Sequence, residues 1–327
     1  MIELNTVYGP VQSWRFGRSL GIDAIKPPKK CTYSCIYCQL GRTARYLKSP
    51  RDLKEPVTPE EVEADLRSYM RKLNEADIDF VTVSGCGEPT LNPMLKGIIE
   101  AVRKVLPTRR VVVLTNSSLM RLKDVREALS EADITVAKLD AGDEKAYRIV
   151  NRPAPGMPEV RELASTIKEA RRDFRCLMLQ VMLLETTWGF SNVKPPHLSS
   201  LLDMVLDINP DVVQLEVPYR PPAEPYVKVP PREDVLRAHQ ALVEHLGRGR
   251  VWTYGLHDRR GRPVRWLAEA SEQMVLELLA RRPCTAQDVA QALSIPPSEA
   301  ELILKSLLEK GEVASVKLGG LMYYVVR

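Results

Sequence analysis

The sequence predicts an α/β protein: a partial (β/α)6 barrel with a parallel sheet, plus a small C-terminal winged helix-turn-helix domain. Two observations lead to this prediction. Short apolar runs rich in β-branched residues alternate with helical segments through the first 257 residues, which is typical of a parallel sheet covered by helices. After a basic segment that contains Gly and Pro, the pattern changes to three helices and a hairpin.

Six short and mostly continuously apolar runs are predicted to be strands. These are Gly21–Ile25, Phe80–Ser84, Val111–Thr115, Ile134–Leu139, Leu177–Leu183 and Val212–Val217. Six segments have helical periodicity, namely Pro59–Ala76, Met94–Val105, Asp124–Glu131, Val160–Arg172, Leu201–Asp207 and Arg232–Leu246. No antiparallel hairpin signal interrupts them. Six β/α units are too few to close an eight-stranded barrel, so we expect an open partial barrel.

The C-terminal part is predicted to be a separate domain. The boundaries we expect are 1–257 for the barrel, 258–267 for a basic linker and 268–327 for the winged helix-turn-helix domain. Gly319-Gly320 is a strong hairpin turn signal. The predicted elements are helices over Ala268–Arg282, Thr285–Leu293 and Ser298–Lys310 and strands over Val313–Leu318 and Leu321–Val326.

Composition favours a cytoplasmic enzyme. The chain has 327 residues, of which 44% are hydrophobic and 27% are charged, as in ordinary globular proteins. No stretch approaches the roughly 20 apolar residues that span a bilayer. The six cysteines are expected to stay reduced, which indicates a reducing compartment.

Three of those cysteines form a C-x3-C-x2-C triad, Cys31, Cys35 and Cys38. The triad offers three thiolates, whereas a closed zinc site or a fully ligated [4Fe–4S] cluster needs four ligands. All four histidines lie in the second half of the chain. A cubane on this loop would therefore keep one iron open to a cosubstrate. The alternatives are a structural zinc loop with a distant fourth ligand, or three thiols buried without a metal.

A second motif follows a predicted strand and reads Gly85-Cys86-Gly87-Glu88-Pro89. Glycines at the end of a strand let a ligand approach the backbone closely. Glu88 supplies a carboxylate that can accept hydrogen bonds from a positively charged amino group. Taken alone, the motif is also compatible with a tight turn.

Together these residues resemble the radical S-adenosylmethionine (SAM) superfamily. Its C-x3-C-x-aromatic-C loop is matched by Cys31–Cys38, and its Gly-Gly-Glu-Pro motif is matched by Gly85–Pro89 with Cys86 displaced into the middle. The resemblance covers roughly residues 9–230. Three flanking segments resemble a branch of iron–sulfur oxidoreductases grouped with the wyosine-base-forming tRNA enzymes: Gly9-Pro10, Arg18–Gly21 and Gln39–Thr43.

The resemblance implies two cofactors, a [4Fe–4S] cluster and SAM. It implies that the triad holds three irons, that the amino and carboxylate groups of SAM bind the fourth, and that Glu88, with the backbone around Gly85 and Gly87, orients the amino group. Tyr37 is expected to lie near the adenine, or only to shield the cluster from water. An external one-electron donor is implied as a partner, and the product of SAM cleavage is a 5′-deoxyadenosyl radical that removes hydrogen from a substrate.

Polar residues at other predicted strand ends are further candidates, because ligands bind at the carboxyl ends of parallel strands. Asn116 and Asp140 are candidates for SAM contact. Lys138 shares one face of its strand with Asp140 by the two-residue period. No catalytic residue is assigned, but Lys138 and Arg220 are candidates, the latter on a proline-rich loop that would clamp a phosphate or carboxylate. For each of them the alternative is an ordinary structural role.

The net charges of the two parts of the chain bear on three hypotheses about its function and partner. Residues 268–327 carry six Lys/Arg and eight Asp/Glu, a net charge of −2, whereas the rest of the chain carries +7. The first hypothesis is a radical SAM enzyme that modifies RNA, with a tRNA base as its substrate. The second is modification of a peptide or protein docked by the winged domain. The third is a cluster-containing regulator that binds DNA, which the acidic C-terminal helices argue against. No membrane partner is expected.

Overall fold

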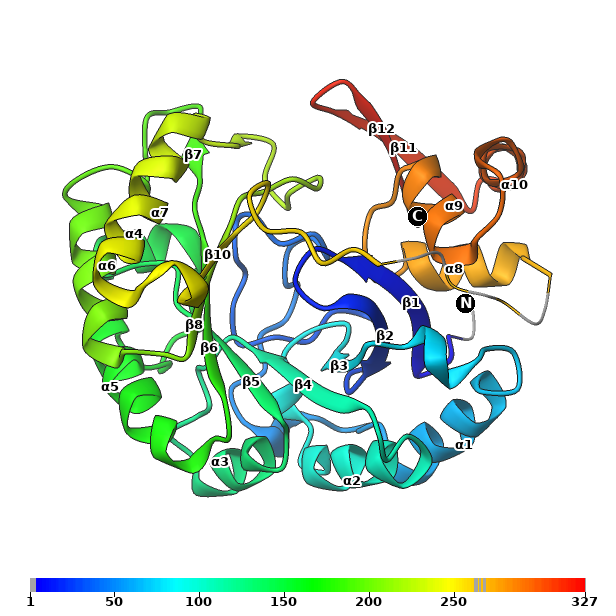
Figure 1. Ribbon diagram of the computed structural model, residues 1–327, viewed down its shortest axis with the longest axis horizontal. Coiled ribbons are helices and arrows are strands. Elements are labelled where there is room, and N and C mark those ends of the chain that lie inside the picture. Colours follow the sequence, from blue (N-terminus) through cyan, green and yellow to red (C-terminus); the bar gives the residue numbers. More distant parts are fainter. Residues whose placement is uncertain (1–3, 262–263, 265, 267–268, 327) are drawn as a thin grey trace.

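The computed structural model of the chain describes residues 4–261, 264, 266 and 269–326. Its centre is an eight-stranded sheet with the order β1-β2-β3-β4-β5-β6-β8-β10. The sheet curls into an open half-barrel with helices on its outer side (Figure 1). The strands are β1 (Val7–Ser13), β2 (Gly17–Asp23), β3 (Phe80–Ser84), β4 (Arg110–Thr115), β5 (Ile134–Lys138), β6 (Leu177–Met182), β8 (Val212–Glu216) and β10 (Val251–Thr253).

Strands β2 to β10 run parallel, each to the next in the sheet. The prediction of a parallel half-barrel is therefore confirmed. Its strand count is wrong, because β10 adds a seventh parallel strand. The prediction of no antiparallel hairpin is also wrong, since β1 pairs antiparallel with β2. A separate short pair is formed by β7 (Glu185–Thr186) and β9 (Val227–Lys228).

In the part of the chain that the structure describes, seven α-helices precede the C-terminal part: α1 (Pro59–Tyr69), α2 (Leu95–Val105), α3 (Lys123–Ser130), α4 (Glu144–Val150), α5 (Val160–Ala170), α6 (His197–Ile208) and α7 (Arg232–Leu246). Of these, α4 was not predicted. Local sequence sets several boundaries. Thr58 and Glu61 form a capping box at the start of α1, with Pro59 at its first position, and α6 ends at Asn209 in the left-handed conformation. Short 3-10 turns occupy Pro50–Asp52, Glu75–Asp77, Pro89–Leu91, Arg171–Asp173 and Arg248–Arg250.

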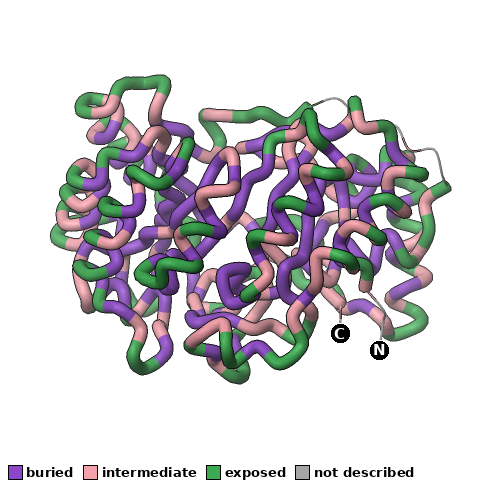
Figure 2. Tube along the Cα trace, turned by 90° about the horizontal axis from the view of Figure 1, so that it is seen from below, coloured by how far each residue is buried: buried purple, intermediate pink, exposed green. Residues whose placement is uncertain are grey.

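The main core lies between the sheet and these helices, and Figure 2 shows the buried segments running through the middle of the molecule. A second apolar cluster fills one end of the half-barrel. It contains Trp14 and Phe16 from the β1–β2 turn, with Val112, Met178 and Trp252 from the strands. The turn therefore folds beneath the barrel and closes it from below.

The C-terminal unit (residues 269–326) has its own apolar core. Its elements are α8 (Glu272–Leu279), α9 (Ala286–Leu293), α10 (Pro297–Glu309), β11 (Val313–Leu318) and β12 (Leu321–Val326), in the order predicted for a winged helix-turn-helix domain. Both α8 and α9 contact β1. The predicted helix start at Ala268, the linker residues 262, 263, 265 and 267, and Arg327 lie outside the described residues.

Among the described residues, none of the helices combines the length and the apolar character that a bilayer-crossing segment needs.

Candidate active site

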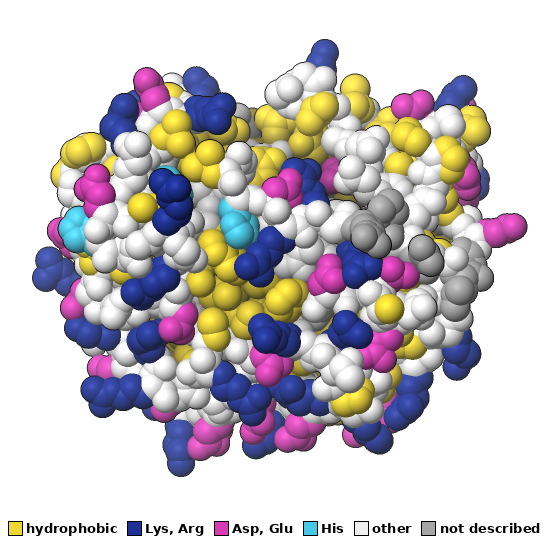
Figure 3. Space-filling model, in the orientation of Figure 1, with side chains coloured by type: hydrophobic (Ala, Val, Ile, Leu, Met, Phe, Trp, Pro, Cys, Tyr) yellow, Lys and Arg dark blue, Asp and Glu magenta, His cyan; other side chains and the backbone are white. Residues whose placement is uncertain are grey.

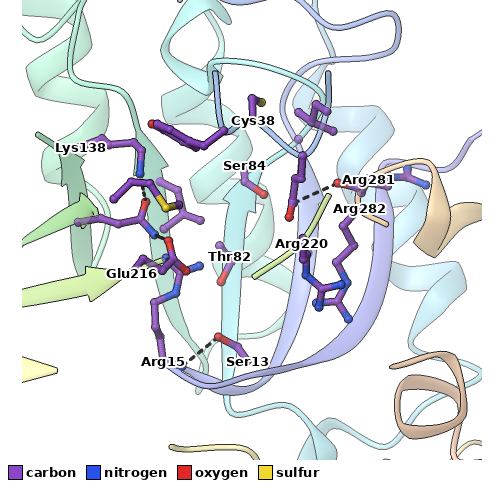
Figure 4. A pocket seen from close by; sticks show the side chains of 18 of the residues that line it. Ser13, Arg15, Cys38, Thr82, Ser84, Lys138, Glu216, Arg220, Arg281 and Arg282 are labelled. Atoms are coloured by element: carbon purple, nitrogen blue, oxygen red, sulfur yellow. Dashed lines mark hydrogen bonds and ion pairs between the residues drawn. The ribbon is translucent and has the colours of Figure 1, made fainter. Parts of the chain in front are cut away.

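A cavity of about 330 Å³ opens at the carboxyl ends of the strands (Figure 4). It brings together nearly all the residues that the sequence singled out, and the one exception is Asp140. The predicted residues that line it are Cys31, Cys35, Tyr37, Cys38, Gly85, Gly87, Glu88, Asn116, Lys138 and Arg220. This volume falls in the range of small-molecule sites.

The cysteine loop follows β2 and is pinned at three points by isolated bridges. These join Lys30 to Gly87, Cys31 to Tyr46, and Tyr33 to Pro153. Cys31 is buried, whereas Cys35 and Cys38 are half-buried, so the loop presents its sulfurs to the cavity while its backbone is fixed. All six cysteines are free thiols.

The thiols are suited to a cluster rather than to a single ion. Within the described residues, no three His, Cys, Asp or Glu side chains converge on one point that would hold a metal ion. A cubane does not require such convergence, because each thiolate binds a different iron. The triad therefore fits a [4Fe–4S] cluster with one iron free of cysteine.

Burial favours the protonated form of Cys31 and Cys35 in the absence of a metal. It raises the pKa of Cys31 to about 12 and that of Cys35 to about 11. Burial alone would lower the pKa of Lys29, but thiolates at Cys38, Cys31 and Cys35 would raise it by more, so the net shift is upward. Metal binding at such a site must displace the protons, and Lys29 is a positive charge close to the resulting thiolates.

Two amides contact the sulfurs. Asn116 Nδ2 lies 3.5 Å from Cys31 Sγ and 2.7 Å from the hydroxyl of Thr32. Asn151 Nδ2 lies 3.7 Å from Cys35 Sγ. Hydrogen bonds to the sulfurs of a cluster tune its reduction potential, and Asn116 lies beside the sulfur of one candidate ligand, Cys31. Asn151 was not predicted, since it follows a helix that the sequence did not reveal.

The turn after β3 requires glycine for a steric reason. A Cβ on Gly87 would stand 1.7 Å from the carbonyl oxygen of Lys30. Gly85 has φ = +105°, which other residues rarely adopt. The turn therefore packs directly against the cysteine loop, and the backbone N–H of Glu88 donates to Lys30 O at 3.0 Å.

Glu88 is only 2% exposed. Its Oε1 accepts hydrogen bonds from the hydroxyl of Thr115 (2.6 Å) and from the hydroxyl (2.6 Å) and N–H (3.1 Å) of Thr90. Its Oε2 accepts from the N–H of Asn116 at 2.7 Å. Burial raises the pKa of Glu88, and these hydrogen bonds oppose that rise. The hydrogen-bond partners of Glu88 in the described part of the chain are all neutral groups, and Oε2 has room for one more donor.

Asp140 lies behind Tyr37 instead of lining the cavity. It accepts a hydrogen bond of 2.5 Å from the Tyr37 hydroxyl and one of 2.7 Å from Asn151. Lys138 Nζ is 4.9 Å from the centre of the Tyr37 ring and 3.4 Å from Asp140. Asp140 is therefore a positioning residue that fixes the aromatic ring of the cysteine loop.

A row of polar side chains crosses the cavity wall below Tyr37. Lys138 Nζ donates to Gln180 Oε1 at 3.2 Å, and Gln180 Nε2 donates to Glu216 Oε2 at 2.7 Å. Glu216 Oε1 also accepts from Trp14 Nε1 at 3.3 Å and lies 3.8 Å from Arg15 Nη1. Gln180 and Arg15 were not predicted. A single Gln inside an otherwise apolar strand is the signal that would have found Gln180.

The C-terminal unit contributes Arg281 and Arg282 to the cavity lining. Arg281 is ion-paired at 2.7 Å with Asp23, at the end of β2, and each side chain is 3% exposed. The carbonyl of Arg281 accepts a hydrogen bond from Gln39, the residue after the triad, at 3.3 Å. The unit is thus fixed to the barrel directly beside the cysteine loop.

Arg220 faces the same region but is already engaged. Its guanidinium donates to the carbonyl of Pro283 and pairs with Asp288 at 3.2 Å. The pKa of Asp288 is lowered, because the charges of Arg220 and Arg282 outweigh the effect of burial. Arg220 therefore holds the C-terminal unit in place. The carboxylate of Asp288 interacts with the charges of both Arg220 and Arg282.

The family follows from this fold and site. A family model described as the Radical SAM superfamily matches residues 25–189, about half of the chain and the part that contains the cysteine triad and the Gly85–Pro89 turn. The chain therefore belongs to the radical SAM superfamily. It is an enzyme, and its cofactors are those of the superfamily, SAM and a [4Fe–4S] cluster.

Three relatives are similar over most of their length. A UPF0026 protein of Helicobacter pylori strain 26695 is 30% identical over 97% of this chain and 96% of its own. One of Synechocystis is 36% identical over 66% of this chain and 76% of its own. A UPF0026 protein of Methanocaldococcus jannaschii is 28% identical over 98% of this chain and 96% of its own.

Solved structures share the fold. SuiB of Streptococcus suis bound to SAM has a TM-score of 0.51 with 15% identity over 73% of this chain, and the chain spans 51% of SuiB. A radical SAM methyltransferase of Sphaerobacter thermophilus has a TM-score of 0.50 with 17% identity, covering 72% of this chain and 64% of its own.

Proposed function

We propose that Cys31, Cys35 and Cys38 hold three irons of the cluster and that SAM binds the open iron beside Glu88. The observation that supports this is the meeting of the triad and the Glu88 carboxylate in one cavity. The chemistry that the bound cofactors supply is reductive cleavage of SAM, with one electron from an external donor, to methionine and a 5′-deoxyadenosyl radical that takes a hydrogen atom from the substrate.

The residues of the chain bind and orient. Oε2 of Glu88 would accept a hydrogen bond from the ammonium group of SAM, and this cation would compensate a buried carboxylate whose partners among the described residues are all neutral. Tyr37, fixed by Asp140, would pack against the nucleoside. Asn116 holds Glu88 through its N–H and contacts Cys31 through its amide, so it couples the SAM site to the cluster site.

The test is reductive cleavage of SAM by anaerobically reconstituted protein, read as released 5′-deoxyadenosine together with iron content. The Cys35→Ala variant should lose the brown absorbance of the cluster and release no 5′-deoxyadenosine. Cys176→Ala, a thiol outside the cavity lining, is the matched control and should keep both. Full iron content in Cys35→Ala would overturn the assignment of the triad.

For the substrate, a tRNA base is the first candidate. It is supported by the resemblance to the wyosine branch and by the net charge of +7 outside residues 268–327. A peptide is the second candidate, and the shared fold supports it because SuiB has been solved with its precursor peptide SuiA. RNA that copurifies and dissociates as salt is raised would support the first, whereas a peptide that changes mass on incubation would support the second.

The C-terminal unit is proposed to be a winged helix-turn-helix domain that serves the barrel rather than DNA. It supplies Arg281 and Arg282 to the cavity, and exposed Glu299, Glu301 and Glu309 lie on α10. Figure 3 shows acidic and basic side chains interspersed over one face of the molecule, without a broad basic surface. Membership in an enzyme superfamily also argues against a DNA-binding regulator.

A further inference from the structure

Arg15 lies at the opposite end of the cavity from the cysteine loop. Figure 4 shows Cys38 at one end, then Ser84 and Thr82 along β3, and Arg15 at the other end. Ser84 and Thr82 are two residues apart on one strand, a separation of about 7 Å. The cavity thus extends from the proposed SAM site down into the barrel, and Arg15 stands on its floor.

The guanidinium of Arg15 has donors without acceptors. Its Nε and Nη1 are buried and donate no hydrogen bond to any described residue. The carboxylate paired with it, Glu216, is 3.8 Å from Nη1, which is too long for a hydrogen bond. Glu216 already accepts from Gln180 and Trp14. A buried donor without an acceptor is energetically costly. The side chain of Arg15 also lines the cavity and is 14% exposed, so the arginine is placed to receive a partner that enters the cavity.

The surroundings of Arg15 hold it in one orientation. Its guanidinium carbon lies 5.8 Å from the ring centre of Trp14 and 5.7 Å from that of Phe16. Both rings are buried in the apolar cluster that closes the barrel, so they are fixed themselves. A rigid, planar guanidinium suits a carboxylate or phosphate, which it can bind with two parallel hydrogen bonds.

We propose that the floor of the cavity binds an acidic group of the substrate, a carboxylate or a phosphate, through Arg15. This inference rests on the proposed function, because it places the substrate below SAM in the same cavity. The acidic group of the substrate would bind deepest in the cavity, at Arg15. The carbon that loses hydrogen would then lie between Arg15 and the cysteine loop. An internal RNA base would present an uncharged edge to Arg15, since its phosphates stay in the chain, so of the two substrate candidates proposed above the arginine favours the peptide, which can present a free carboxylate.

The experiment is calorimetric titration of the anaerobically reconstituted, SAM-loaded full chain with inorganic phosphate and, separately, with succinate. We expect one of the two anions to bind the wild type and to bind Arg15→Gln at least roughly tenfold more weakly, with Arg15→Lys in between. Iron content and SAM affinity should stay unchanged in all of them. Arg161→Gln, which removes the same charge from the exposed surface of α5, is the matched control and should bind as the wild type does.

A second variant tests the same idea from the other side. Glu216→Gln removes the negative charge that lies 3.8 Å from Arg15 Nη1, so anion binding should become tighter by roughly several-fold. If Arg15→Gln does not fold, the anion affinity of Glu216→Gln tests the proposal instead.

Three results would overturn the proposal: neither anion binds the wild type, Arg15→Gln binds as tightly as the wild type, or Arg15→Gln loses SAM affinity in parallel. The readout is binding rather than turnover. Failure of the proposed function would instead appear as wild-type protein that takes up no cluster or releases no 5′-deoxyadenosine, whatever its affinity for anions.

Discussion

Replacing Asp23 with alanine should leave the guanidinium of Arg281 buried without its counter-ion. The two side chains are 2.7 Å apart and each is 3% exposed. Asp23 ends β2, and Arg281 belongs to the C-terminal unit, so the pair joins the two parts of the chain beside the cavity. Arginine keeps its proton at all accessible pH values, and the variant therefore cannot relieve the buried charge.

The expected magnitude differs between the two sides of the pair. Removing one partner of a buried ion pair costs about 3–5 kcal/mol, and we expect Asp23→Ala to lower the free energy of unfolding by that amount. Arg281→Met should cost less, about 2 kcal/mol, because Asp23 can take up a proton. Burial raises the pKa of Asp23 to about 6 even though Arg281 opposes the rise. Protonating such a carboxyl at pH 7 costs only about 1.4 kcal/mol.

The pH dependence has opposite signs in the two variants. The folded-state pKa of Asp23 lies above its ordinary value of 3.8, so its contribution to stability is full below that value and is lost as pH rises through about 6. Relative to the wild type, the deficit of Asp23→Ala should therefore grow by about 1 kcal/mol between pH 7 and pH 5. In Arg281→Met the pKa rises further, and the deficit should shrink between pH 8 and pH 6.

The assay is urea unfolding of the cluster-loaded protein under anaerobic conditions, followed by tryptophan fluorescence at several pH values. Asp207→Ala breaks the exposed pair between Lys168 and Asp207 and serves as the control, with an expected cost of at most about 1 kcal/mol. Equal costs for Asp23→Ala and Arg281→Met, or deficits that move in the same direction with pH, would refute the reasoning.

Three further predictions concern the cysteine loop and its neighbours. Gly87→Ala should lower iron content and stability, because its Cβ would stand 1.7 Å from a carbonyl oxygen of the cysteine loop; Gly249→Ala, with nothing within 4 Å, should change neither. Glu88→Gln should keep its iron and bind SAM roughly tenfold or more weakly, and unchanged SAM affinity would disprove its role. Tyr37→Phe removes the hydroxyl that donates to Asp140 and should lower the free energy of unfolding by about 1–2 kcal/mol without loss of iron, as iron analysis and urea unfolding will show.

The parts of the fold that sequence reasoning predicted are those with a strong local signal. Strands such as Leu177–Met182 are buried along their whole length, so their residues form continuous apolar runs. The cysteine triad and the Gly85–Pro89 turn are each contiguous in sequence. Their meeting in one cavity follows from two parallel strands that end at the same edge of the sheet.

Elements without such a signal were missed. Strand β1 contains Gly9-Pro10, which is typical of a turn, and its pairing with β2 is irregular between Tyr8 and Val11. Strand β10 has only three residues. Helix α4 has only seven residues and lies between the predicted strand Ile134–Leu139 and the predicted helix Val160–Arg172, where no element was predicted.

The row from Lys138 to Arg15 could not be found by spacing, because its members come from distant segments. Gln180 and Glu216 meet because β6 and β8 are neighbouring strands, in which Gln180 lies opposite Gln214, two residues before Glu216. Arg15 reaches them only because the β1–β2 turn folds beneath the barrel. Each residue alone looks like an isolated polar side chain, and only the three-dimensional arrangement shows that they share a wall.

The contact of α8 and α9 with β1 has a practical consequence for anyone who shortens this protein. Strand β1 is an outer strand of the sheet, and such a strand offers unpaired N–H and C=O groups to any other chain that can extend it. A version cut before α8 would bare that side together with apolar surface, and it would be prone to self-association during expression. We therefore expect solubility to depend on keeping about the last sixty residues.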